Sequence, residues 1–342
     1  MKTGIIQDEI FLQHDTGPYH PERKERLVFI HQGLQSFAHR EALLRIEPRL
    51  ATHAELQLVH PQSHIRKIES TSHREETHLD PDTTASSRSY EVARFAVGGL
   101  LALIDSLFTG EIQNGFAFVR PPGHHAEPER AMGFCLFSNV AIGAAYALSK
   151  YPVRRVMVVD FDVHHGNGTQ SAFYDRNDVL FVSTHQWPLY PGTGDFGEVG
   201  EGQGKGFTLN FPLPSGSDDS MYRLLFEKVI TPIGRIYKPE LLLVSAGYDA
   251  YVEDPLAGMS LTIDGFHAIS RSLVELAQEV CRGRILFALE GGYHLRGLQA
   301  SVLQSLDALI GQKKLLLPLD TSSHFEPILK KSRDWFSPFW HF

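Results

Sequence analysis

The 342-residue sequence predicts an α/β fold with a central, mostly parallel sheet flanked by helices on both faces. Short apolar and β-branched runs alternate along the chain with longer segments of helical periodicity, as in doubly wound sheets. The apolar runs are continuous, which is typical of parallel strands that are buried on both faces.

The elements follow from these two periodicities. Strands are predicted at residues 116–119, 156–160, 179–183, 241–245 and 285–289, and helices at 22–37, 88–108, 138–150, 218–237 and 264–281. Ser138 suits a helix N-cap, Pro21 a helix start and Gly283 a helix stop. The length prior allows two domains, but we expect one domain over residues 1–342, with its core over about 1–311.

Composition excludes several classes of protein. With 32 Lys and Arg against 40 Asp and Glu, the net charge is −8, which gives no footprint for binding nucleic acid. Hydrophobic residues make up 42% of the chain, too many for a disordered protein. Two cysteines cannot build a disulfide scaffold and fit a cytoplasmic setting. We expect no secretory signal and no membrane span.

Each predicted strand is followed by a loop rich in Gly, His, Asp or Tyr. These loops read RPPGHH, FDVHHGNG, THQWPLYPGTGD, AGYDAYVEDP and EGGYH. Parallel strands bring such loops to one edge of the sheet, where ligands of open α/β sheets bind. The pattern therefore predicts a site at this edge.

The segment DFDVHHGNG offers metal ligands. In extended backbone alternate residues share a face, so Asp160, Asp162 and His164 would point the same way. Asp162 and His164 supply an oxygen and a nitrogen, and Asp249 at the end of the LLLVSAGYD run is a candidate third ligand. A single Asp here would more simply cap a loop or helix, but burying the whole cluster without a cation is costly.

Two further motifs offer catalytic groups. His124 and His125 in tandem suggest general acid–base chemistry, with Asp160 and Asn167 as hydrogen-bond partners of the imidazoles. Tyr293 of EGGYH could be a packed side chain at a helix entry, but beside a metal its phenol can donate to an oxyanion. Together these groups suit the hydrolysis of an amide.

The ordered motifs RPPGHH, GFC, DFDVHHGNG, PGTGD, SAGYDA and LEGGY resemble the histone deacetylase family, which includes bacterial deacetylase-like amidohydrolases and acetylpolyamine amidohydrolases. The resemblance runs from HDTGPYHPERKERL to about residue 310. It implies a single arginase-like α/β domain, zinc ligands Asp162, His164 and Asp249, the histidine pair His124 and His125, and the transition-state tyrosine Tyr293. Asn167 resembles the class II-like branch, in which asparagine partners the second histidine.

The same resemblance implies a substrate tunnel. Phe134 and Tyr190 would form its aromatic walls, which suit the aliphatic stem of an acylated lysine. The Gly133 carbonyl would accept the substrate amide hydrogen, Arg26 would line an internal acetate channel, and Asp80 would be a rim carboxylate that grips the substrate backbone. A K⁺ or Na⁺ site would involve Asp160, Asp162, His164, Ser183 and Thr184.

Two positions depart from related sequences. His294 follows the GGY motif, and we expect it to face solvent. Leu256 stands where the vertebrate polyamine-selective branch has a glutamate, so selection of a second cationic amine is less supported.

Alternatives remain at this stage. A two-manganese ureohydrolase of the same fold needs Asp-x-His-x-Asp, but Gly166 stands where the last carboxylate would be. An acetylpolyamine deacetylase and a catalytically inactive acyl-lysine-binding protein stay open, as does Fe²⁺ in place of Zn²⁺. The aromatic segment 312–342 is expected to pack on the domain or to form a subunit contact, so a homo-oligomer also stays open.

Overall fold

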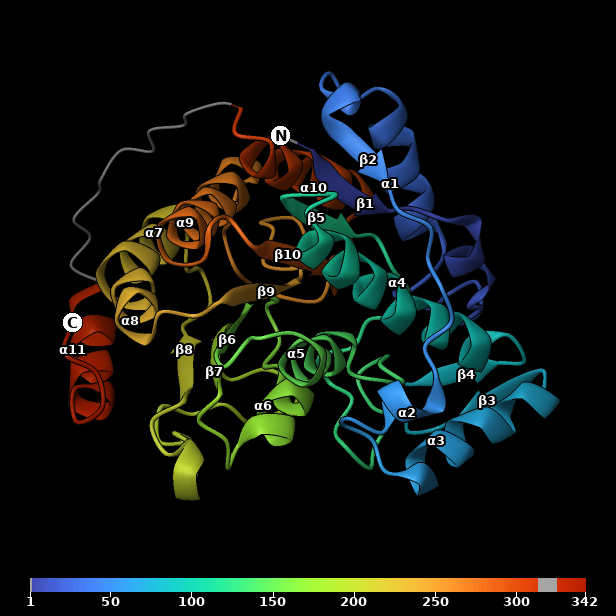
Figure 1. Cartoon of the computed structure of the whole chain (residues 1–342), viewed down its shortest axis with the longest axis horizontal. Helices are drawn as coiled ribbons and strands as arrows, with labels where there is room; N and C mark the ends of the chain where they lie inside the picture. Colours follow the sequence, from blue (N-terminus) through green and yellow to red (C-terminus); the bar gives the residue numbers. More distant parts are fainter. Residues whose placement is uncertain (1, 313–324) are drawn as a thin grey trace.

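The computed structural model describes residues 2–312 and 325–342, and a parallel sheet of eight strands runs through its centre (Figure 1). In sheet order, the strands are β2 (Leu43–Arg45), β1 (Thr3–Ile6), β5 (Asn114–Ala117), β10 (Ile285–Leu289), β9 (Leu241–Ala246), β6 (Val156–Asp160), β7 (Val179–Gln186) and β8 (Thr208–Leu213). A separate antiparallel pair consists of β3 (Glu76–His78) and β4 (Thr84–Ser86). The predicted fold class is confirmed.

The five predicted strands are the five neighbours β5, β10, β9, β6 and β7. The bounds of β6 and β10 agree with the prediction, and β7 and β9 extend further. The strand predicted at 116–119 was misplaced by two residues, because β5 covers Asn114–Ala117. Phe118 and Val119 are buried just beyond β5, and the Phe118 N–H still donates to the Ile6 carbonyl at 3.0 Å, so the apolar run continues past the end of the strand.

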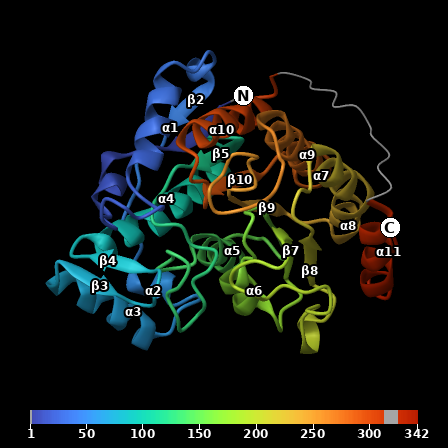
Figure 2. The same cartoon turned by 180° about the vertical axis from the view of Figure 1, so that it is seen from behind.

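Helices cover both faces of the sheet, as Figures 1 and 2 show. One group packs side by side and comprises α1 (Glu25–Gln35), α7 (Asp219–Leu225), α8 (Thr231–Tyr237), α9 (Ile263–Cys281) and α10 (Leu295–Leu309). The other comprises α2 (His53–Leu56), α4 (Ser89–Thr109), α5 (Asn139–Lys150) and α6 (Asn167–Phe173), with α3 (Gln62–Glu69) nearby. Buried aliphatic and aromatic side chains from the sheet fill the space between these layers.

Two helix predictions need correction. The helix expected from residue 22 begins only at Glu25, because Glu22 is fully buried and its carboxylate binds arginines. The helix expected over 218–237 is interrupted by a π-helical turn at Phe226–Ile230 between α7 and α8. Pro232, which has no backbone N–H to donate, follows this turn and favours the irregularity.

Helix α4 is long and apolar enough to cross a membrane by length and composition alone, although it contains the charged residues Glu91, Arg94 and Asp105. It is, however, a core helix, because 67% of its most apolar window is buried inside the protein. Its contacts with β1, β5 and α5 account for the apolar sequence.

The aromatic residues near the C-terminus lie partly against the sheet. Helix α11 (Phe325–Phe336) contacts β8 and α7, and the fully buried Phe336 ring packs on Phe211. The Trp340 indole N–H donates to the Gly206 carbonyl at 2.7 Å. Residues 313–324 of the predicted segment 312–342 lie outside the described residues.

Candidate active site

The site forms where five neighbouring strands end. The loops after β5, β6, β7, β9 and β10 carry, in that order, the histidine pair, the Asp-x-His segment, Tyr190, Asp249 and Tyr293. Because these strands are parallel neighbours, their carboxyl ends meet at one edge. The sheet therefore brings together side chains that are up to 169 positions apart in the sequence.

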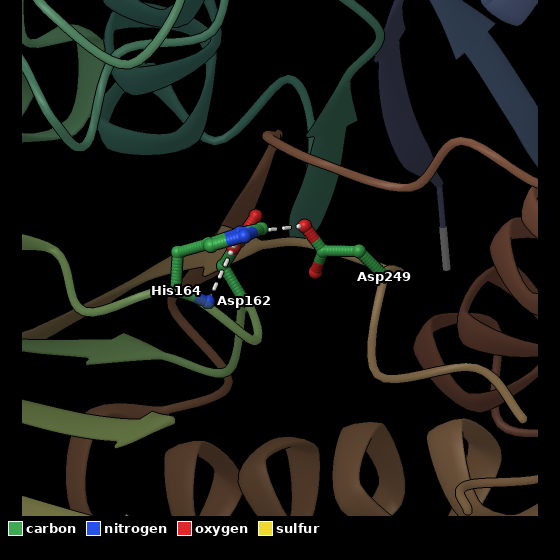
Figure 3. A group of neighbouring side chains, drawn as sticks. All are labelled: Asp162, His164 and Asp249. Carbon is green, nitrogen blue, oxygen red and sulfur yellow. Dashed lines mark hydrogen bonds and ion pairs between the residues drawn. The ribbon is translucent and has the colours of Figure 1, made fainter. Parts of the chain in front are cut away.

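Asp162, His164 and Asp249 converge at the floor of the site (Figure 3). His164 Nδ1 lies 3.2 Å from Asp162 Oδ1 and 3.1 Å from Asp249 Oδ2, and both carboxylates are fully buried. Backbone N–H groups fix the opposite oxygens: that of Gly291 donates to Asp162 Oδ2 and that of Val163 to Asp249 Oδ1. A Cβ on Gly291 would lie 2.1 Å from Asp249 Oδ2, so this loop approaches the carboxylates as only glycine permits.

The charge balance of this cluster fits a divalent cation. Burial, followed by repulsion from Asp162, raises the pKa of Asp249. Burial lowers the pKa of His164, but its bonds to Asp162 and Asp249 outweigh this effect and raise it to about 10. Two carboxylates around one imidazole thus favour the binding of a cation. Two oxygen donors and one nitrogen donor suit zinc or iron(II).

The two histidines of the pair have different partners. His124 Nδ1 lies 3.0 Å from Asp160 Oδ2, whereas His125 Nδ1 lies 2.8 Å from Asn167 Oδ1. Burial opposes protonation of His124, but Asp162 and Asp160 raise its pKa well above the usual range. Burial, and then the charges of His124 and His164, hold the pKa of His125 well below it. One imidazole therefore favours holding a proton and the other favours the neutral form.

Tyr293 is held by its backbone and by a neighbouring cation. The Asp254 carboxylate accepts the N–H groups of Tyr293 at 2.7 Å and of His294 at 3.1 Å. The Arg26 guanidinium carbon lies 5.0 Å from the centre of the Tyr293 ring. Burial raises the pKa of Tyr293 well above its usual value, so the phenol keeps the proton that it would donate.

A cavity of about 220 Å³ opens from this floor. It is lined by Asp82, His125, Gly133, Phe134, His164, Leu189, Tyr190, Leu256 and Tyr293. The Phe134 ring stands edge-on to Tyr293, and the Tyr190 ring stands edge-on to His125. Gly133 has a φ of +56°, and a Cβ there would lie 2.3 Å from the His125 ring, so glycine is required at this wall.

Several predicted residues have other surroundings than expected. Asp82 lines the cavity instead of Asp80, which accepts the N–H of Asp82 and so stabilises the turn beneath it. Arg26 is fully buried beside the Tyr293 ring and donates to the carbonyls of Glu290 and Gly292, so its place in an internal acetate channel stays a prediction. His294, expected to face solvent, is only partly exposed and caps α10, because its Nδ1 accepts the N–H of Gly297.

The residues of the expected monovalent-cation site are all buried where β6 and β7 end. Asp160 pairs in register with Ser183, and the Thr184 hydroxyl is 3.5 Å from the Asp160 carbonyl. Ser183 Oγ also lies 2.9 Å from His185 Nδ1. The site for K⁺ or Na⁺ stays a prediction.

Sequence reasoning missed three carboxylates that support the site. Glu22 pairs with both Arg26 and Arg120, Asp254 tethers the Tyr293 loop, and Glu127 contacts Asn167. Asp254 lies inside the AGYDAYVEDP loop, and Glu127 lies two residues after RPPGHH. Their position beside the motifs was the available signal, but their partners come from distant parts of the chain.

Comparison with known proteins places these observations in a family. Residues 20–309 match the family described as the histone deacetylase domain. A probable deacetylase of Archaeoglobus fulgidus is 38% identical over 87% of this chain and 83% of its own length. Histone deacetylase 14, chloroplastic, of Arabidopsis thaliana is 45% identical over 74% of this chain, a match that spans 61% of that protein.

A solved structure agrees over nearly the whole chain. The crystal structure of the HDA15 HD domain superposes with a TM-score of 0.92 at 36% sequence identity, covering 99% of this chain and 95% of that domain.

Proposed function

Because the chain belongs to the histone deacetylase family, we propose that it is a metal-dependent amidohydrolase that removes acetyl or other acyl groups from acyl-lysine or a similar small acylated amine. The observation that supports this proposal best is the cavity itself. Its aromatic walls lead to His125, His164 and Tyr293, and His164 belongs to the group of three side chains that could hold a metal ion. A tunnel of this kind suits a slender aliphatic amine with an acyl group at its end.

Asp162, His164 and Asp249 would hold the divalent ion, with Zn²⁺ as the first choice and Fe²⁺ as the second. When bound, such an ion is a Lewis acid that polarises the amide carbonyl and lowers the pKa of water. K⁺ or Na⁺ would bind structurally beside β6 and β7.

The side chains of the site would carry out proton transfer, oxyanion stabilisation and substrate binding. His125, whose pKa is held low by burial, accepts a proton from the attacking water. Tyr293 donates a hydrogen bond to the oxyanion that forms on the substrate. His124 holds a proton beside Asp160 and can deliver it to the leaving amine. Phe134 and Tyr190 enclose the aliphatic stem, and the Gly133 carbonyl accepts the substrate N–H.

The substrate class can be tested with a panel of acyl compounds. We propose to measure kcat/KM of the metal-loaded protein for acetyl-, trifluoroacetyl- and longer acyl-lysine peptides and for acetylated polyamines. Turnover of acyl-lysine peptides above polyamines is expected, because an uncharged leucine lines the cavity at position 256, where a glutamate would bind a second amine. No turnover of any compound by metal-loaded protein would favour an acyl-lysine-binding protein that lacks catalysis.

Leu256 offers a matched pair of variants for the alternative substrate. Leu256→Glu should raise kcat/KM for acetylated polyamines relative to acyl-lysine, while the uncharged Leu256→Gln should not. A wild-type preference for polyamines would instead support an acetylpolyamine deacetylase.

A further inference from the structure

Beyond the residues of the proposed mechanism, Glu127 lies on the turn that directly follows the histidine pair. Its backbone forms a short bridge with Arg130, and its side chain is partly buried beside the start of α6. The first residue of α6 is Asn167, the partner of His125. The turn and the helix start are tightly packed, because a Cβ on Gly168 would lie 2.4 Å from the Ala126 carbonyl oxygen.

Two hydrogen bonds in series connect Glu127 to the proposed base. Asn167 Nδ2 donates to Glu127 Oε1 at 2.8 Å, and Asn167 Oδ1 lies 2.8 Å from His125 Nδ1. The Asn167 amide nitrogen also contacts Met132 Sδ at 3.4 Å, a second acceptor on the same side. Both ends of the carboxamide are therefore engaged, one by acceptors and the other by the imidazole.

The direction of each bond follows from the chemistry of the groups. A carboxylate only accepts hydrogen bonds, so the carboxamide must turn its NH₂ toward Glu127 and its oxygen toward His125. That oxygen also only accepts, so His125 Nδ1 must carry the hydrogen of the neutral imidazole. The lone pair is then on Nε2, which is the atom that a proton acceptor in the cavity needs.

His124 needs no second residue to orient its partner, because Asp160 is a carboxylate and either of its oxygens accepts a hydrogen bond. A carboxamide is ambiguous: turned by 180°, it would offer its NH₂ to His125 and favour the tautomer with the hydrogen on Nε2. That tautomer cannot accept a proton at Nε2. An acceptor on the far side of Asn167 removes this ambiguity.

We propose that Glu127 is a positioning residue that acts through the Asn167 carboxamide to fix the His125 tautomer, with Nδ1 protonated and Nε2 free. Its consequence for catalysis rests on the proposed function, but the tautomer itself does not. The outer side of Glu127 and Asn167 lines a surface cavity of about 320 Å³, shared with Gln170, Thr193 and Glu201. Glu127 thus lies outside the substrate cavity, so its substitution leaves the side chains that line that cavity in place.

The tautomer can be read directly by ¹⁵N NMR of the histidine nitrogens in zinc-loaded protein, with His125 assigned from a His125→Gln variant. In wild type and Glu127→Gln, whose amide oxygen still accepts from Asn167, Nδ1 should carry the hydrogen. In Glu127→Ala a substantial population should shift to the Nε2-protonated form. An unchanged tautomer in Glu127→Ala would overturn the proposal whether or not the protein turns over any substrate.

Turnover gives a second and separate readout. Glu127→Ala should lower kcat about 10- to 100-fold with little change in KM, the range known for outer partners that orient metal-bound histidines. Glu127→Gln should retain most of kcat, and Glu129→Ala, an exposed carboxylate on the same turn, should match wild type. Full kcat in Glu127→Ala would exclude orientation of His125 through the Asn167 amide.

A further test moves the negative charge from position 127 to position 167. Asn167→Asp places two carboxylates against each other and should lower kcat, while adding Glu127→Gln should recover part of the loss because the new amide can donate. Additive losses in the double variant would contradict the proposal. If wild type is inactive on the whole substrate panel, the proposed function fails, and the NMR result alone decides on the role of Glu127.

Discussion

At the residue scale, two adjacent histidines differ in their hydrogen-bond partners and therefore in their pKa values. His124 faces a carboxylate and His125 a carboxamide, and their pKa values move in opposite directions. The sequence predicts these partners, because alternation along DFDVHHGNG places Asp160 toward the site and Asn167 follows in the same loop. It could not identify Asp82 as the cavity carboxylate instead of Asp80, because the two lie in one turn and only its folded shape separates them.

Tyr293 gives the residue-scale prediction. Tyr293→Phe removes one oxyanion donor while its ring can keep the contacts with Phe134 and Arg26, so kcat should fall about 100-fold or more with stability unchanged. Steady-state kinetics and thermal unfolding of both proteins measure this. Full activity of the variant would refute the role of the phenol.

At the element scale, the strands that carry the site were the predictable ones. The five central strands are buried on both faces and therefore read as continuous apolar runs, whereas β1, β2 and β8 lie toward the sheet edges and were missed. The short β2 is only partly buried and offers little pattern to detect. Helix boundaries were also harder to predict. Glu22 binds Arg26 and Arg120, and α1 begins only after it, at Glu25. Pro232 has no backbone N–H to donate and favours the π-helical turn between α7 and α8.

Helix α4 gives a prediction about packing. A Cβ on Gly98 would lie 1.9 Å from the Arg49 carbonyl oxygen, a backbone atom that cannot turn away. Gly98→Ala should therefore lower the free energy of unfolding by about 1–3 kcal/mol. Gly99→Ala is the matched control, because its nearest neighbour is the Ile6 side chain at 3.1 Å and alanine favours a helix by about 1 kcal/mol. Equal urea midpoints for the two variants would contradict this account of the packing.

At the scale of the whole molecule, several histidines outside the site are buried in neutral form. Burial lowers the pKa of His14 and of His60 to about 3. The unfolded chain takes up protons at these positions near pH 6.5, but the folded protein does so only near pH 3. The free energy of unfolding should thus fall as the pH drops from about 6.5 to 3, by up to about 1.4 kcal/mol per pH unit for each histidine.

His60→Gln isolates one of these contributions. The substitution keeps a donor for the Pro128 carbonyl and an acceptor for the Ser138 N–H but removes the titrating group. The free energy of unfolding should therefore fall less steeply between pH 6 and 4, by about 1.4 kcal/mol per pH unit, which corresponds to one proton. Urea unfolding across this range, with the exposed His73→Gln as control, measures the slope. A slope identical to wild type would show that His60 does not carry this linkage.

Titration of Zn²⁺ or Fe²⁺ into metal-free protein measures whether turnover depends on the bound ion. Acetate release from an acetyl-lysine peptide should rise in proportion to bound metal, up to about one ion per chain. Asp249→Ala should lose both the metal and the activity, while Glu129→Ala should retain both. Wild-type turnover by the metal-free protein, or stoichiometric metal and full activity in Asp249→Ala, would exclude metal-dependent catalysis at this site.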